Sequence, residues 1–72
     1  MNKRVYITLN RVGSNYVAQE VLVAGQNVTA LSKPESFPTV EEACRYARAA
    51  IAVNPKATIA TTLASAKRVL SI

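Results

Sequence analysis

The sequence predicts a small α+β domain: a three-stranded antiparallel meander, one amphipathic helix packed on one face, and a returning fourth strand (β-β-β-α-β). Three patterns support this order. Apolar and polar residues alternate at period two in the first half of the chain, apolar residues recur at helical spacing after residue 39, and a threonine-rich segment follows. The 72 residues are expected to form a single domain, 1–72.

Three segments are predicted as strands: residues 5–11, 16–23 and 28–31. The first alternates apolar and polar side chains, as a half-buried strand does, and the second is rich in branched residues. Gly25-Gln26 is predicted to form a two-residue type II′ turn between the second and third strands, because that turn takes Gly at its first central position.

The loop between the first two strands decides which side chains share a face, because a slip of one residue exchanges the faces of a strand. A two-residue loop, Gly13-Ser14, would place Ile7 opposite Glu20 on the buried face. We expect instead a three-residue loop, 13–15, which pairs Ile7 with Val21. The predicted buried face is then Val5, Ile7, Leu9, Val17, Val21, Val23, Val28 and Ala30, and the predicted outer face is Tyr6, Thr8, Val12, Tyr16, Ala18, Glu20, Leu22 and Leu31.

A helix is predicted to begin at a capping box and to end at Asn54-Pro55. In that box Thr39 accepts from the Glu42 amide, and Glu42 reaches back. The apolar stripe of the helix is Val40, Ala43, Cys44, Ala47, Ala50 and Ile51. Cys44 lies on this stripe and is therefore predicted to be a buried core residue. Residues 32–38 are predicted to form a loop that crosses the sheet.

The tail of the chain has two competing patterns. Residues 57–62 are predicted to form the returning strand. Beyond Leu63, apolar residues sit at helical spacing (Ile59, Leu63, Ala66 and Leu70), but residues 67–72 also alternate as a strand does. We favour a continuing strand, and the helix remains the alternative.

Residue types exclude several chemistries. The chain has no His, no Asp and a single Cys, so Ser-His-Asp and Cys-His catalysis and zinc sites are ruled out within one chain. We therefore predict a protein that is not an enzyme, with no catalytic residue, cofactor or metal. The lone cysteine fits a cytoplasmic location, and no segment is long and apolar enough to span a membrane.

The outer sheet face is the candidate partner-binding surface. Tyr6, Tyr16 and Leu22 would form its centre, with basic residues at the rim: Lys3, Arg4 and Arg11. Aromatic anchors with arginine typically carry the binding energy of protein interfaces, so protein binding is the leading hypothesis. The alternative is nucleic-acid binding, in which the tyrosines stack on bases and the Lys and Arg side chains contact phosphates. The formal net charge of +5 is compatible with this alternative. A homodimer through the same face is a third arrangement.

One segment carries a resemblance. Phe37-Pro38-Thr39-Val40-Glu41-Glu42-Ala43 leads into the helix and Asn54-Pro55-Lys56-Ala57-Thr58-Ile59 leaves it. Over residues 37–60 this order resembles small uncharacterised proteins of bacteriophages and bacteria. The resemblance implies that the protein inhibits or redirects a host complex, such as RNA polymerase or a defence nuclease. It implies no particular site residues.

Overall fold

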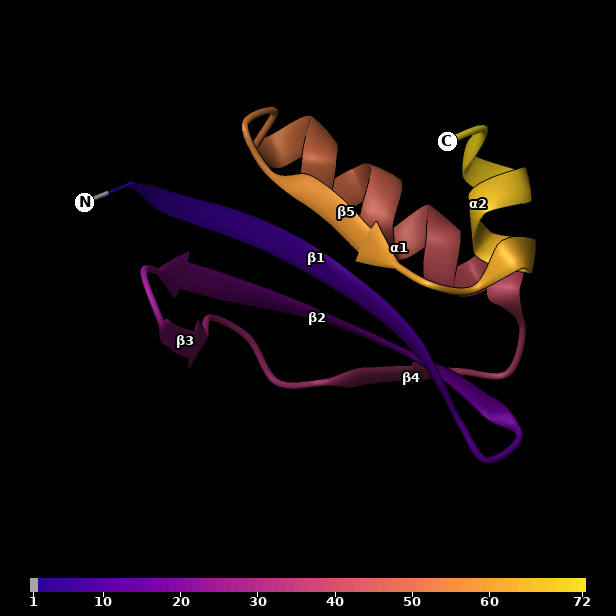
Figure 1. Cartoon of the computed structure of the whole chain (residues 1–72). Coiled ribbons are helices and arrows are strands. Elements are labelled where there is room, and N and C mark those ends of the chain that lie inside the picture. Colours follow the sequence, from indigo (N-terminus) through magenta and orange to yellow (C-terminus); the bar gives the residue numbers. More distant parts are fainter. Residues whose placement is uncertain (1) are drawn as a thin grey trace.

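The computed structural model describes residues 2–72 and contains one sheet and two helices (Figure 1). The elements are β1 Lys3–Val12, β2 Asn15–Ala24, β3 Asn27–Ala30, β4 Glu35–Phe37, α1 Val40–Val53, β5 Thr58–Thr61 and α2 Ala64–Leu70. The predicted α+β class is confirmed. The predicted order of elements is wrong in detail, because a short strand precedes α1 and a second helix follows β5.

The sheet is mostly antiparallel and has the order β3-β2-β1-β5. The loop prediction for residues 32–38 is wrong for β4, which pairs antiparallel with β2 beyond β3 on the same edge. The returning strand is confirmed over 58–61, and it lies parallel to β1. Because β4 and β5 flank β2 and β1, α1 crosses over the sheet between them, as Figure 1 shows.

The register between β1 and β2 differs from the predicted one. Gly13-Ser14 forms a two-residue turn, so Ile7 lies opposite Glu20 and Leu9 opposite Ala18. Gly13 has a positive φ of +62°, whereas the φ of Ser14 is negative. Among residues 2–72, Ser71 is the one non-glycine residue with a positive φ. This combination is that of a type II′ turn, whose twist matches the twist of the flanking strands. The predicted three-residue loop is therefore wrong.

Both helices pack on one face of the sheet, which we call the helix face. The buried core consists of Ile7, Leu9, Ala18, Ala43, Cys44, Ala47 and Ala66. Ile7 and Leu9 come from β1 and Ala18 from β2, whereas the other four come from α1 and α2. Since neighbouring residues of a strand point to opposite faces, the residues between Ile7 and Leu9 and beside Ala18 point away from both helices.

Helix α1 begins and ends where the sequence predicts. The Thr39 hydroxyl accepts a hydrogen bond from the Glu42 amide at 3.3 Å, and the Asn54 amide donates to the Ala50 carbonyl at 2.9 Å before Pro55 stops the helix. The buried residues of α1 are two alanines and Cys44, as predicted for its stripe. Small side chains let the helix axis approach the sheet closely.

The predicted strand beyond Leu63 is wrong, because residues 64–70 form α2. The Thr61 hydroxyl donates to the Leu9 carbonyl at 2.8 Å and accepts from the Leu63 amide at 3.1 Å, which turns the chain out of the sheet. Ala66 then becomes fully buried, and the Arg48 guanidinium donates to the Val69 carbonyl at 2.7 Å. Helical spacing of the apolar residues therefore prevails over alternation here.

The positive φ at Gly13 generates a prediction. A Cβ built at Gly13 meets no heavy atom within 4 Å, so Gly13→Ala changes only the backbone preference. We expect it to lower the free energy of unfolding by about 1–2 kcal/mol, the cost of a positive φ for an L-residue. Urea denaturation measures this loss, and Ser14→Ala is the matched control with little effect. Equal stability of the two variants would contradict the observed turn.

Candidate docking surface

The face of the sheet opposite the helices, which we call the open face, is the candidate site. Alternation along the paired strands places these residues on it: Arg4, Tyr6, Thr8, Asn10, Val17, Gln19, Val21, Val23, Val28, Ala30, Ser36, Thr58 and Ala60. None of the buried core residues within 2–72 belongs to this set. Neither helix covers it.

Three valines form the apolar centre of the open face. Val23 lies opposite Val28 across the β2–β3 pair, and Val21 lies opposite Tyr6 across the β1–β2 pair. Val28 is 66% exposed. Directly opposed side chains in a sheet have Cβ atoms about 4.5–5.5 Å apart, so these residues form one continuous apolar patch. Such a patch on a sheet is typical of an interaction surface.

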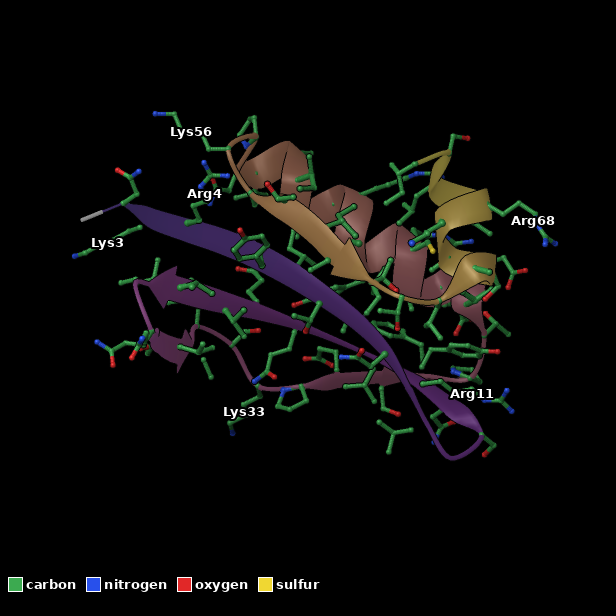
Figure 2. All side chains as sticks on the ribbon, viewed as in Figure 1. Lys3, Arg4, Arg11, Lys33, Lys56 and Arg68 are labelled. Atoms are coloured by element: carbon green, nitrogen blue, oxygen red, sulfur yellow. The ribbon has the colours of Figure 1, made fainter. Side chains whose placement is uncertain are left out.

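Two predicted contact residues do lie on the open face. Tyr6 flanks the valines, and Arg4 lies opposite Val23 at the end of β1. Lys3, the preceding residue, points to the other side and lies opposite Ala24. Figure 2 shows Lys3 and Arg4 at the same end of the sheet. The structure therefore brings Tyr6 and Arg4 together with valines that were predicted to be core residues.

The other predicted contact residues lie on the helix face. Tyr16 lies two residues before Ala18 and Leu22 four residues after it, so both share the face of Ala18 on β2, and Arg11 lies opposite Tyr16. Tyr16 packs against the core cluster and lies opposite Phe37 of β4. The predicted two-tyrosine surface is thus wrong, because the shorter turn exchanges the two faces of β2. Tyr6 and Tyr16 cannot contact one flat partner together.

The valines were missed as surface residues for the same reason. The three-residue loop, which keeps an acidic side chain from lying opposite Ile7, places Val21, Val23 and Val28 in the core. The signal that could have found them is the dipeptide Gly13-Ser14, since Gly at the first of two loop residues is the pattern of a type II′ hairpin. Glu20 is only half-buried, so the pairing with Ile7 does not take this acidic residue wholly out of solvent.

Charge on the open face is purely positive. Among the described strand residues that alternation places on this face, Arg4 is the one charged side chain. The acidic residues lie elsewhere: Glu20 opposite Ile7 and Glu35 opposite Ala18 belong to the helix face, while Glu41 and Glu42 are in the first turn of α1. Within the described strands, the surface therefore combines an apolar centre with a basic end and holds no carboxylate.

Cys44 is not suited to nucleophilic chemistry. Its side chain is fully buried, and its Sγ donates to the Ala66 carbonyl at 3.9 Å. Burial raises the pKa of the thiol; the nearby Arg48 lowers the pKa and Glu41 raises it, both by smaller amounts. Since the thiolate is the reactive form, this cysteine is held in its unreactive state. Its predicted role as a core residue is confirmed.

Comparison with models of known protein families, with characterised proteins and with solved structures finds no match. No helix within residues 2–72 has the length and apolar character needed to cross a membrane. In the same range, His, Cys, Asp and Glu side chains form no group of three that could hold a metal ion.

Because Tyr16 lies on the helix face and Tyr6 on the open face, replacing each with alanine should lower the free energy of unfolding by different amounts. Tyr16→Ala removes an aromatic ring packed on the core, so we expect a loss of about 2–3 kcal/mol in the free energy of unfolding. Tyr6→Ala removes only cross-strand contacts on the open face and should cost less than about 1 kcal/mol. Urea denaturation of both variants measures the difference. A larger loss for Tyr6→Ala would show that the faces are assigned the wrong way round.

The raised pKa of Cys44 predicts how stability depends on pH. The unfolded thiol loses its proton at a lower pH than the native one, so stability from this group is fully present below the usual pKa of a free thiol and is lost as pH rises through the raised native pKa. Denaturation of wild type and Cys44→Ala at pH 7–10 measures this fall. The difference in stability between the two should shrink at high pH, and a difference that grows would contradict burial of the neutral thiol.

Proposed function

We propose that this protein is a non-enzymatic binding module that docks its open face onto a partner protein. The observation that carries the proposal is the patch of Val21, Val23 and Val28 beside Tyr6 on a sheet face that neither helix covers. The partner surface that fits has an apolar centre and carboxylates facing Arg4. Burial of apolar area supplies the affinity, and the charge pair at the end orients the complex.

Charge favours a different protein over a second copy of this chain. Each copy carries a formal net charge of +5, and its open face has a cation but no carboxylate. Two such faces brought together would repel one another and bury no ion pair. An acidic partner gains from the same field, which also speeds encounter.

The register also favours protein over nucleic acid. Binding of single strands relies on several aromatic rings on one face together with cations that follow the backbone. The open face holds one tyrosine and one arginine, because Tyr16 and Arg11 are on the helix face. Aliphatic side chains in the centre offer a base no stacking surface. The nucleic-acid alternative thus loses the tyrosine pair on which it was built.

The resemblance over residues 37–60 adds a class of partner to this proposal. In that interpretation the partner is a host macromolecular complex, such as RNA polymerase or a defence nuclease, and docking of this protein inhibits or redirects the activity of that complex. The absence of His and Asp and the burial of Cys44 support action by binding rather than by catalysis.

Isosteric variants test the docking surface. Val21→Thr/Val23→Thr keeps the shape and strand preference of both residues and makes the centre polar. Val53→Thr is the matched control, because Val53 is 88% exposed on α1 and lies away from the sheet. Proteins captured from a bacterial lysate are identified, and the dissociation constant of each purified candidate is measured with all three proteins. We expect the double variant to weaken binding at least tenfold, about 1.4 kcal/mol or more.

Two results would sink the proposal. One is unchanged affinity of the double variant, and the other is an equal loss with Val53→Thr. The nucleic-acid alternative has its own arm, in which mixed-sequence single-stranded RNA and DNA are titrated at two salt concentrations. Binding that falls steeply with salt and is insensitive to the valine variants would establish that alternative instead.

A further inference from the structure

A second feature lies at one end of the sheet, outside the apolar patch. A cavity of about 310 Å³ is lined by the start of β1, the end of α1 and the start of β5. Its lining residues are Lys3, Arg4, Val5, Asn54, Lys56 and Thr58. Three of these six are cations and two are neutral polar residues. Figure 2 shows Lys3, Arg4 and Lys56 at this corner of the molecule, with the Lys3 side chain extending away from the other two.

The backbone holds these groups in place. Tyr6 lies beside Thr58 in the parallel β1–β5 pair, so Arg4 and Lys56 stand two residues earlier on neighbouring segments. The Ala57 amide donates to the Asn54 carbonyl at 3.0 Å, which closes a turn with Pro55 and Lys56 in its middle positions. Pro at the first of these positions fixes φ and stiffens the turn. Lys56 is therefore presented by an ordered turn.

Within residues 2–72, no carboxylate lines this cavity. Glu41 and Glu42 lie in the first turn of α1, and 14 residues of helix put them about 20 Å away, well beyond the screening length of about 8 Å. Glu20 is opposite Ile7 on the helix face, three positions or about 10 Å along the strands from the level of Arg4. The carboxyl end of α1 contributes only about −0.5 of a charge against three cations.

We propose that this corner is a binding site for a phosphate group. A guanidinium donates two parallel hydrogen bonds to phosphate oxygens, lysine ammonium groups add point charges, and the Asn54 amide and Thr58 hydroxyl can donate to the remaining oxygens. A dianion is attracted to the positive charges that line the cavity, and no carboxylate among its lining residues competes for them. The volume is at the lower end of small-ligand sites, which suits a phosphate monoester.

The probe is potassium phosphate, titrated into the ¹⁵N-labelled protein at constant ionic strength with potassium chloride as the balancing salt. We expect saturable amide shifts confined to Lys3, Arg4, Lys56 and Thr58. Parallel titrations with O-phosphoserine and with a nucleoside monophosphate identify which monoester binds more tightly than the free ion. Lys56→Gln should weaken the phosphate dissociation constant about tenfold or more, as loss of a charged hydrogen bond does.

Arg68→Gln is the matched control, because Arg68 is an exposed cation on α2 at the other end of the molecule (Figure 2). Because a charge at that distance is screened by salt, this variant should leave the phosphate affinity within about twofold of that of the wild type. Shifts that equal those in chloride alone, or an equal loss with Arg68→Gln, would overturn the site. Val21→Thr/Val23→Thr should bind phosphate normally, so failure of this site and failure of the docking surface are distinguishable.

Discussion

The two-residue turn at Gly13-Ser14 is the constraint on which the rest of the structure depends. Its positive φ at Gly13 sets Val12 opposite Asn15, and the ladder from there puts Leu9 opposite Ala18. That pairing builds the sheet half of the core. A slip of one residue would turn Ala18 outward, bring the valines of β2 under the helix, and leave no room for the close packing of α1.

The second consequence of this register is that small side chains lie between the sheet and α1. Ala18 faces Ala43, Cys44 and Ala47 in the buried cluster, so α1 lies near the sheet with few large residues between them. The large branched residues of β2 are left for the open face. A short chain that places valines on its surface and alanines in its core gives up part of the burial that stabilises a domain, which a partner on the open face would restore.

Local signals were sufficient for much of the fold and insufficient for the site. Thr39, Glu42 and Pro55 define α1 because capping and proline effects act within one turn of helix. Which side chains of β2 face the helices depends on whether the loop has two or three residues. The prediction of a three-residue loop gave more weight to keeping Glu20 away from Ile7 than to the preference of a type II′ turn for glycine at its first position. The half-buried position of Glu20 removes that conflict, and only the tertiary structure shows it. Likewise, the meeting of Arg4 with Lys56 depends on the parallel β1–β5 pairing, which no local pattern encodes.

The most direct test of the open face is the register itself, read from cross-strand Hα–Hα contacts in an NMR spectrum. In a two-residue hairpin the pair flanking the turn is hydrogen-bonded, so the alternate pairs that include Leu9–Ala18 and Ile7–Glu20 bring their Hα atoms together. The observed register predicts strong Hα–Hα signals for these two pairs. Signals instead between Ile7 and Val21 would contradict it, because they would place the valines under the helix and Tyr16 back on the open face.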